Sequence, residues 1–265
     1  MIIRALAVAA TLLLAAVPLC AQLEYYELET GRPLRVQSAQ AIERYAWEVQ
    51  VGPGLSVPSS GSSYALESAI AYGVLPRTQL EITMPFVSMP GATGGRSAGL
   101  AGLGLGALYN LNAETISLPA FAVAAQVTTT AGSQAPSAPL LSLEGIATRS
   151  FTGMRLHLNA AATIGPNDAT ANGVDRSRWS AGAAIDHAWP IQSLLAAVEL
   201  FAERPLAPAS AVAWSAGAGV RFQATPPLVL DAALSRRFTG DQPAWMATLG
   251  VTWSFAVRAL MPVQP

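Results

Sequence analysis

The stretch WMATLGVTWSF, residues 245–255, decides how the fold of this protein is read. Every second residue in it is apolar, and the residues between are small or mildly polar. A period of two is typical of a β-strand with one apolar face. That face must contact either a protein core or a lipid bilayer. The apolar positions are Trp245, Ala247, Leu249, Val251, Trp253 and Phe255.

The same alternation recurs along the chain from Glu43 onward. It predicts about 12 strands of roughly ten residues, the length that a tilted strand needs to cross a bilayer. Short stretches such as LPRT, SFTG and ATPP alternate with longer ones such as GPGLSVPSSGSS, SMPGATGGRSAG and PNDATANGVDRSR. Short turns on one rim and longer loops on the other are typical of a transmembrane barrel. The expected fold is therefore all-β, an antiparallel up-and-down transmembrane β-barrel spanning residues 41–255.

Composition agrees with a barrel in lipid. Hydrophobic residues make up 52% of the chain and charged residues 12%, about half the usual charged fraction of roughly 25%. After the N-terminal segment, no apolar run is long enough for a transmembrane helix. Basic and acidic residues nearly balance, 15 against 16, so no nucleic acid or other polyanion is expected as a partner.

The first residues read as an export signal. MIIRALAVAATLLLAAVPLCAQ has an early Arg4, an apolar stretch and a small-residue exit, the layout of a secretory signal peptide over residues 1–21. Lipidation of Cys20 is the alternative, which the bulky Leu19 before it disfavours. Cleavage after Ala21 leaves a chain without cysteine, and so without disulfides. The expected location is the outer membrane of a Gram-negative cell.

Aromatic residues near the predicted strand ends fit two interfacial girdles, where amphipathic rings meet the lipid head groups. A secreted soluble β-sandwich also alternates, but its outer face should be richly charged and its long edge strands would need protection. A closed barrel satisfies every backbone group within lipid and leaves no edge. The girdle candidates are Trp179, Trp189, Trp214, Trp245, Trp253 and Phe255.

Four segments resemble the outer-membrane barrels grouped with a MetA-pathway phenol-degradation protein, which are putative transporters by family description. They are TGRPLRVQSAQAIERYAWEVQVG (30–52), ALESAIAYGVLPRTQLEITMPF (65–86), GLAGLGLGALYNL (99–111) and LDAALSRRFTGDQPAWMATLGVTWSF (230–255). The third departs from the family, with Leu103 and Leu108 where Asp and Lys often stand. The resemblance implies passage of small solutes, aromatic or hydrophobic ones among them.

Parity places a set of charged residues on the inward face, where acids outnumber bases. Arg221 and Asp231 flank the ATPP turn and are expected to lie opposite or diagonal to each other across one hairpin, within reach of an ion pair. His157 is expected near Glu144 across a hairpin. The charges could neutralise one another in a filled interior, or line a cation-tolerant conduit or shallow binding site. The lumen-lining candidates are Glu48, Glu67, Glu81, Glu144, Arg155, His157, Asp186, Glu199, Glu203, Arg221, Asp231 and Arg237.

Nothing in the sequence indicates catalysis. The two histidines, His157 and His187, have no nucleophile in a recognisable pattern, and no spacing suggests a metal or cofactor. Outer-membrane lipid, the barrel-assembly machinery and a small solute are the expected partners. Residues 22–40 lack alternation and are expected in the periplasm, across the barrel mouth or inside it as a plug. Residues 256–265 are expected as a periplasmic tail. The alternatives are a structural barrel with a filled lumen and the secreted sandwich.

Overall fold

The computed structural model describes residue 28 and residues 32–58, 61–91, 94–166, 170–171, 174–175, 177–207, 210–240 and 244–257. The proposed signal peptide and nearly all of the proposed tail lie outside these residues. Within them, no helix is long and apolar enough to cross a membrane. The described elements are β-strands.

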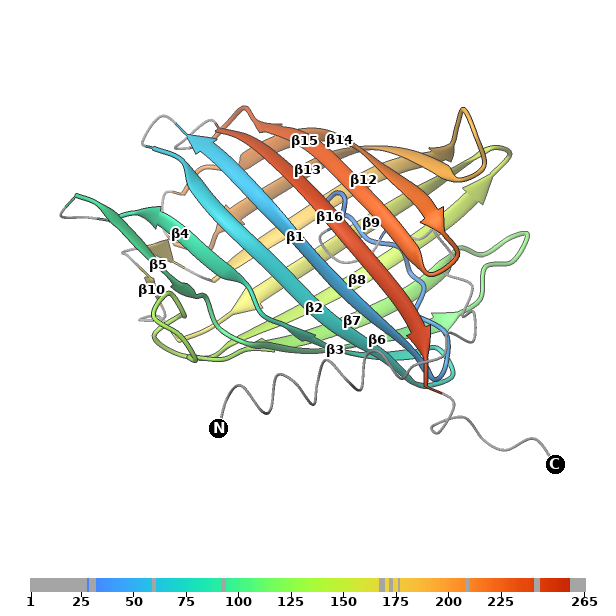
Figure 1. Cartoon of the computed structure of the whole chain (residues 1–265), viewed down its shortest axis with the longest axis horizontal. Helices are drawn as coiled ribbons and strands as arrows, with labels where there is room; N and C mark the ends of the chain where they lie inside the picture. Colours follow the sequence, from blue (N-terminus) through green and yellow to red (C-terminus); the bar gives the residue numbers. More distant parts are fainter. Residues whose placement is uncertain are drawn as a thin grey trace.

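One antiparallel sheet closes on itself into a barrel (Figure 1). Its fourteen strand segments form twelve barrel strands, because β3 continues into β4, and β5 into β6, after short interruptions. β10 and β11 form a separate small hairpin. The strands are β1 (Ala46–Pro58), β2 (Ser63–Leu75), β3 (Thr78–Thr83), β4 (Phe86–Pro90), β5 (Arg96–Leu100), β6 (Gly104–Asn112), β7 (Ala120–Thr128), β8 (Leu140–Phe151), β9 (Met154–Ile164), β10 (Thr170–Ala171), β11 (Val174–Asp175), β12 (Arg178–Ala188), β13 (Leu194–Pro205), β14 (Ala213–Thr225), β15 (Leu228–Arg237) and β16 (Ala244–Ala256).

Closure joins the first strand to the last. β1 pairs with β2 on one side and β16 on the other, with Val51 opposite Val251 and Trp47 opposite Phe255. The opening stretch is therefore the closing strand. Every strand of the wall has two partners, which satisfies the backbone without an exposed edge. This confirms the predicted twelve-stranded barrel and rules out the β-sandwich.

The barrel is apolar outside and polar inside. On β16, the outward-facing Leu249 is 59% exposed, whereas the inward-facing Thr252 is fully buried. Two concavities of about 920 and 550 Å³ lie on the outer wall and are lined by apolar side chains such as Ile185, Val198 and Leu105. The outer face thus answers the opening question: it is fitted to lipid, in agreement with an outer-membrane location.

Aromatic rings gather at both ends of the barrel. Trp179, Trp214 and Trp245 are each the second residue of β12, β14 and β16, which run in the same direction, so the three rings lie at one end of the barrel. Trp189, Trp253 and Phe255 lie toward the opposite end. There the ring centroids of Trp253 and Phe255 are 4.9 Å apart. The six rings are therefore placed as two interfacial belts would require.

Two predicted loops are wrong in extent. β1 continues to Pro58, well into the predicted loop GPGLSVPSSGSS. The other predicted loop, SMPGATGGRSAG, contains most of the β4–β5 hairpin. Gly, Pro and Ser suggested loops because they are depleted in strands. Here partners on both sides override that preference, since Ser56 pairs with Ser63 on β2 and with Met246 on β16.

Candidate functional site: the polar lumen and its N-terminal insert

A segment before β1 lies inside the barrel (Figure 1). We call Leu28 and residues 32–41 the insert. Ser38 N donates a hydrogen bond of 2.8 Å to the carbonyl oxygen of Leu28, so the two positions lie side by side. Most of the insert's residues are buried. The insert therefore folds back on itself within the lumen.

Arg32 occupies a slot in the wall made by two inward glycines. Its guanidinium donates to the carbonyl oxygens of Leu249 at 2.9 Å and Gly52 at 3.1 Å, and lies 3.6 Å from the Asp231 carboxylate. A Cβ added at Gly52 or Gly250 would lie 2.1 Å from Arg32 Nη1. Only glycine leaves room for the guanidinium at these two positions.

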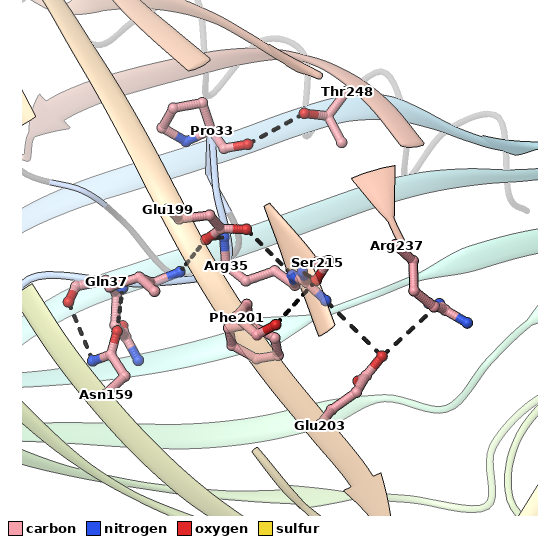
Figure 2. A network of polar contacts seen from close by, with 11 residues as sticks. Pro33, Arg35, Gln37, Asn159, Glu199, Phe201, Glu203, Ser215, Arg237 and Thr248 are labelled. Carbon is pink, nitrogen blue, oxygen red and sulfur yellow. Dashed lines mark hydrogen bonds and ion pairs between the residues drawn. The ribbon is translucent and has the colours of Figure 1, made fainter. Parts of the chain in front are cut away.

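Arg35 lies at the centre of the next group of contacts (Figure 2). Its backbone N–H donates to Glu199 at 2.8 Å, and its guanidinium lies over the Phe201 ring, 3.9 Å from the centroid. The same guanidinium donates to the Ser215 hydroxyl and lies 3.9 Å from Glu203. The insert is thus bound to β13 and β14 through both its backbone and a side chain.

Farther along, the insert contacts strands β9, β8 and β6. Gln37 N donates to the Asn159 side-chain oxygen at 2.7 Å, and its side chain donates to Glu144 at 2.8 Å. Ala39 N donates to the Thr148 hydroxyl at 2.9 Å, and its carbonyl accepts a hydrogen bond from Asn110 at 2.6 Å. Inward side chains therefore satisfy backbone groups that would otherwise be buried without partners.

Two small apolar clusters support these polar contacts. In one, Leu28, Leu34 and Val36 pack on wall residues including Leu195. In the other, Ala39 packs on wall residues including Leu108. Leu108 is the position where the resembling family often has Lys, so in this chain an apolar contact to the insert takes that place.

His157 is not near Glu144, and that expectation is wrong. It lies opposite Thr148, whereas Glu144 lies opposite Ala161. The His157 ring bridges Thr148 Oγ1 and Asp186 Oδ2, each at 3.0 Å. A hydroxyl, an imidazole and a carboxylate in this order resemble a nucleophile with its base. Here the imidazole is fully buried and the hydroxyl accepts the N–H of Ala39, so this row of groups positions the insert.

The other predicted residues all point inward, but in different settings. Arg221 and Asp231 are directly opposite, as expected, and both are buried. Arg155 makes two hydrogen bonds to Asp186, at 3.0 and 2.8 Å. Glu48 accepts hydrogen bonds from Gln50 and Ser254, and Glu81 one from Gln79. Glu67 is exposed, while Glu203 and Arg237 are partly exposed. A lumenal cavity of about 60 Å³ lies beside Gln37.

Sequence reasoning missed the insert residues and most of their polar partners. Arg32, Arg35 and Gln37 lie in a stretch without periodicity, and nothing in the sequence distinguishes Thr148 and Asn159 from other polar residues of the alternating strands. The inward glycines were also missed, although a glycine on the polar face of a strand signals a close approach by another group. In the described parts of the chain, no group of three or more His, Cys, Asp or Glu side chains could hold a metal ion.

The glycine slot leads to a first prediction. Gly250→Ala places a methyl group where Arg32 Nη1 lies, and should expel the guanidinium while leaving the barrel folded. The control is Gly54→Ala. Gly54 also faces inward, on β1, but the nearest atoms to a Cβ added there are 3.8 Å away. We expect proteolysis to cleave the insert faster in Gly250→Ala only. Equal protection in both variants would show that the slot does not hold the insert.

No protein-family model and no curated protein match this sequence. Solved structures do match its fold. An outer membrane channel from Pseudomonas putida F1 superposes with a TM-score of 0.68 at 14% identity, covering 86% of this chain and 100% of the other. The NanC porin gives 0.57 at 6% identity, over 77% and 98%. The KdgM porin gives 0.54 at 10% identity, over 78% and 99%. The chain therefore has the fold of outer-membrane channels and porins.

Proposed function

We propose that this protein passes small solutes across the outer membrane through a lumen that its insert narrows. The single observation that carries this proposal is the wall itself: charged inward side chains remain accessible to solvent beside the insert. Glu67 is exposed, and the side chains of Glu203 and Arg237 are 27% and 30% exposed. If the lumen were filled only for stability, charged side chains in contact with water would add nothing to the packing of the interior. Their presence therefore favours a path for solutes.

The fold supports the same function, since the three structures compared above are a channel and two porins. The resemblance to the phenol-degradation barrels adds a narrower proposal, that aromatic or hydrophobic molecules are among the solutes. Membrane insertion would use the barrel-assembly machinery, with the closing strand and its Phe255 as the recognised signal. The direct test is conductance and solute-dependent liposome swelling of the refolded full chain.

The described lumen has an acidic surplus, so we expect weak preference for cations. Eight inward acids face three arginines of the wall and two of the insert, Arg32 and Arg35. The acids are Glu48, Glu67, Glu81, Glu144, Asp186, Glu199, Glu203 and Asp231, and the wall arginines are Arg155, Arg221 and Arg237. Rings of acidic side chains favour cations in pores.

Glu67→Gln should reduce that preference, measured as a reversal potential that moves toward zero in a salt gradient across a bilayer. Glu67 is the exposed carboxylate of the set, so its removal changes the field in the water and also removes its attraction to Arg32. Arg236→Gln is the control, because Arg236 stacks on the outer Trp245 ring at 5.2 Å. Anion preference in the unaltered protein would contradict the prediction.

The insert also favours a second candidate, a structural barrel with a filled lumen. Its backbone contacts β6, β8, β9, β13 and β16 through inward side chains. Under this alternative, the folded full chain conducts no ions, and a path opens only when the insert is removed. Conductance of the full chain would exclude it.

A further inference from the structure

We infer that Glu203 and Arg237 form a binding site for small zwitterions, solutes that carry a carboxylate and an ammonium group a few ångströms apart. The inference rests on the proposed function, because it assigns a solute class to the same lumen. It comes from the geometry of a row of alternating charges on the inner wall, Glu199, Arg35, Glu203 and Arg237, drawn in Figure 2.

The two ends of this row differ in how tightly they are held. Glu199 is buried and accepts backbone hydrogen bonds from Arg35 at 2.8 Å and Val36 at 3.1 Å. Glu203, by contrast, lies 3.9 Å from Arg35 and 3.8 Å from Arg237. Both distances exceed those of charge-assisted hydrogen bonds, which are about 2.7–2.9 Å. The Glu203–Arg237 pair is in contact but not hydrogen-bonded.

Arg237 has spare hydrogen-bonding capacity. Its Nε is buried, and among the described residues this atom has no hydrogen-bond partner. Its only ion pair in that part of the chain is the 3.8 Å contact with Glu203. Its terminal nitrogens are not buried and make no hydrogen bond within the described residues, so a solute that accepts hydrogen bonds can reach them. A carboxylate suits this role, because it can accept two parallel N–H bonds from one guanidinium.

The balance of charge selects the zwitterion over a simple anion. Glu199 and Glu203 offset Arg35 and Arg237, so the row is neutral as it stands. A carboxylate placed alone on Arg237 would leave this neutral group with a surplus negative charge next to Glu203. A solute with an ammonium group cancels that surplus, because the ammonium can donate to the Glu203 carboxylate. Each loose contact is then replaced by charge-assisted hydrogen bonds, and no charge is left unpaired.

Access to the pair is open. The side chains of Glu203 and Arg237 are 27% and 30% exposed, although both project into the lumen. Glu203 lies two residues before the end of β13, and Arg237 is the last residue of β15, so both lie at the same end of the barrel. A solute entering from that rim would meet this pair before the buried contacts of Arg32 with Asp231. The proposed site therefore stands at the mouth of the lumen, ahead of the insert.

The test is a saturation-transfer NMR titration of the refolded full chain with three probes of similar size: alanine, propionate and ethylammonium. Alanine should bind most tightly. Arg237→Gln and Glu203→Gln should each weaken alanine binding by about tenfold, as expected for the loss of a charge-assisted bond. Arg237→Gln should abolish the residual binding of propionate only, and Glu203→Gln that of ethylammonium only. Glu67→Gln, a carboxylate outside the row, should leave alanine binding unchanged.

Heat-modifiable gel migration establishes that each variant is folded. Equal binding of alanine and propionate would overturn the inference in favour of a simple anion site. Unchanged alanine binding in the two folded row variants would overturn it altogether. The titration requires no passage of solute, so a protein that binds alanine but does not conduct refutes the proposed function alone. A protein that conducts but binds none of the probes refutes only the zwitterion site.

Discussion

Deleting residues 28–40 should raise the conductance of the refolded protein several-fold while the barrel stays folded. The insert occupies lumen that water and ions would otherwise fill, and its removal widens the path. The wall does not depend on the insert for its backbone pairing, since every barrel strand has wall partners on both sides. Single-channel recording measures the first effect, and heat-modifiable migration measures the second.

A second variant separates the volume of the insert from its attachment. Replacing residues 32–41 with Gly and Ser at equal length keeps a chain in place but removes Arg32, Arg35 and Gln37. We expect frequent switching between conductance levels, because a flexible segment without anchors moves in and out of the path. If the folded deletion variant conducts no better than the full chain, the insert does not restrict passage.

The deletion also leaves acids without partners. Asp231 and Glu199 would lose Arg32 and Arg35, so the surplus of inward acids would grow by two. Cation preference should therefore rise together with conductance in the deletion variant. A larger current with unchanged preference would mean that these carboxylates lie outside the ion path.

The two faces of each strand could be predicted because the pleat alternates along most of its length, with register shifts in three strand pairs, all close to strand ends. Once Trp253 is placed outside, Thr252 and Ser254 must point inward, and the same argument extends along each neighbouring strand. For β14 and β15 it placed Arg221 opposite Asp231, since the short ATPP turn fixes the register. Local pattern and turn length were sufficient for the wall.

The same kind of argument failed for His157 because it depended on an assumed register. Phe151 pairs with Met154 across a tight turn, which brings His157 opposite Thr148. Glu144 is four residues farther along β8 and cannot reach the imidazole. A pattern of alternating residues determines the face of a side chain, but only the turn determines its neighbour.

The course of the insert could not be predicted from the sequence. Its contacts join residues far apart in the chain: Arg32 and Leu249, for example, are separated by 217 positions. The insert has no regular hydrogen-bonding pattern, so no periodicity marks its buried side. Gly52 and Gly250 were a usable signal, but glycine is common on the inner wall, and only the structure shows which glycines a guanidinium occupies.

Leu249→Arg should cost about 2–4 kcal/mol of folding free energy in a bilayer, as expected for an arginine facing lipid near the midplane. Leu249 is 59% exposed on the outer face, near the middle of β16, between wall strands β1 and β15. A guanidinium there has neither water nor an inward carboxylate within reach. The measurement is a urea titration of folding into lipid vesicles.

Depth provides the control for this substitution. Leu75 is also exposed, at 54%, but it ends β2 at the β2–β3 turn. Arginine near an interface reaches the head groups, so Leu75→Arg should cost only about 0–1 kcal/mol. Equal costs at the two positions would mean that the outer face of β16 does not contact hydrocarbon. A large penalty confined to Leu249 requires a bilayer whose midplane crosses β16 near that residue, because only depth distinguishes two exposed leucines of one wall.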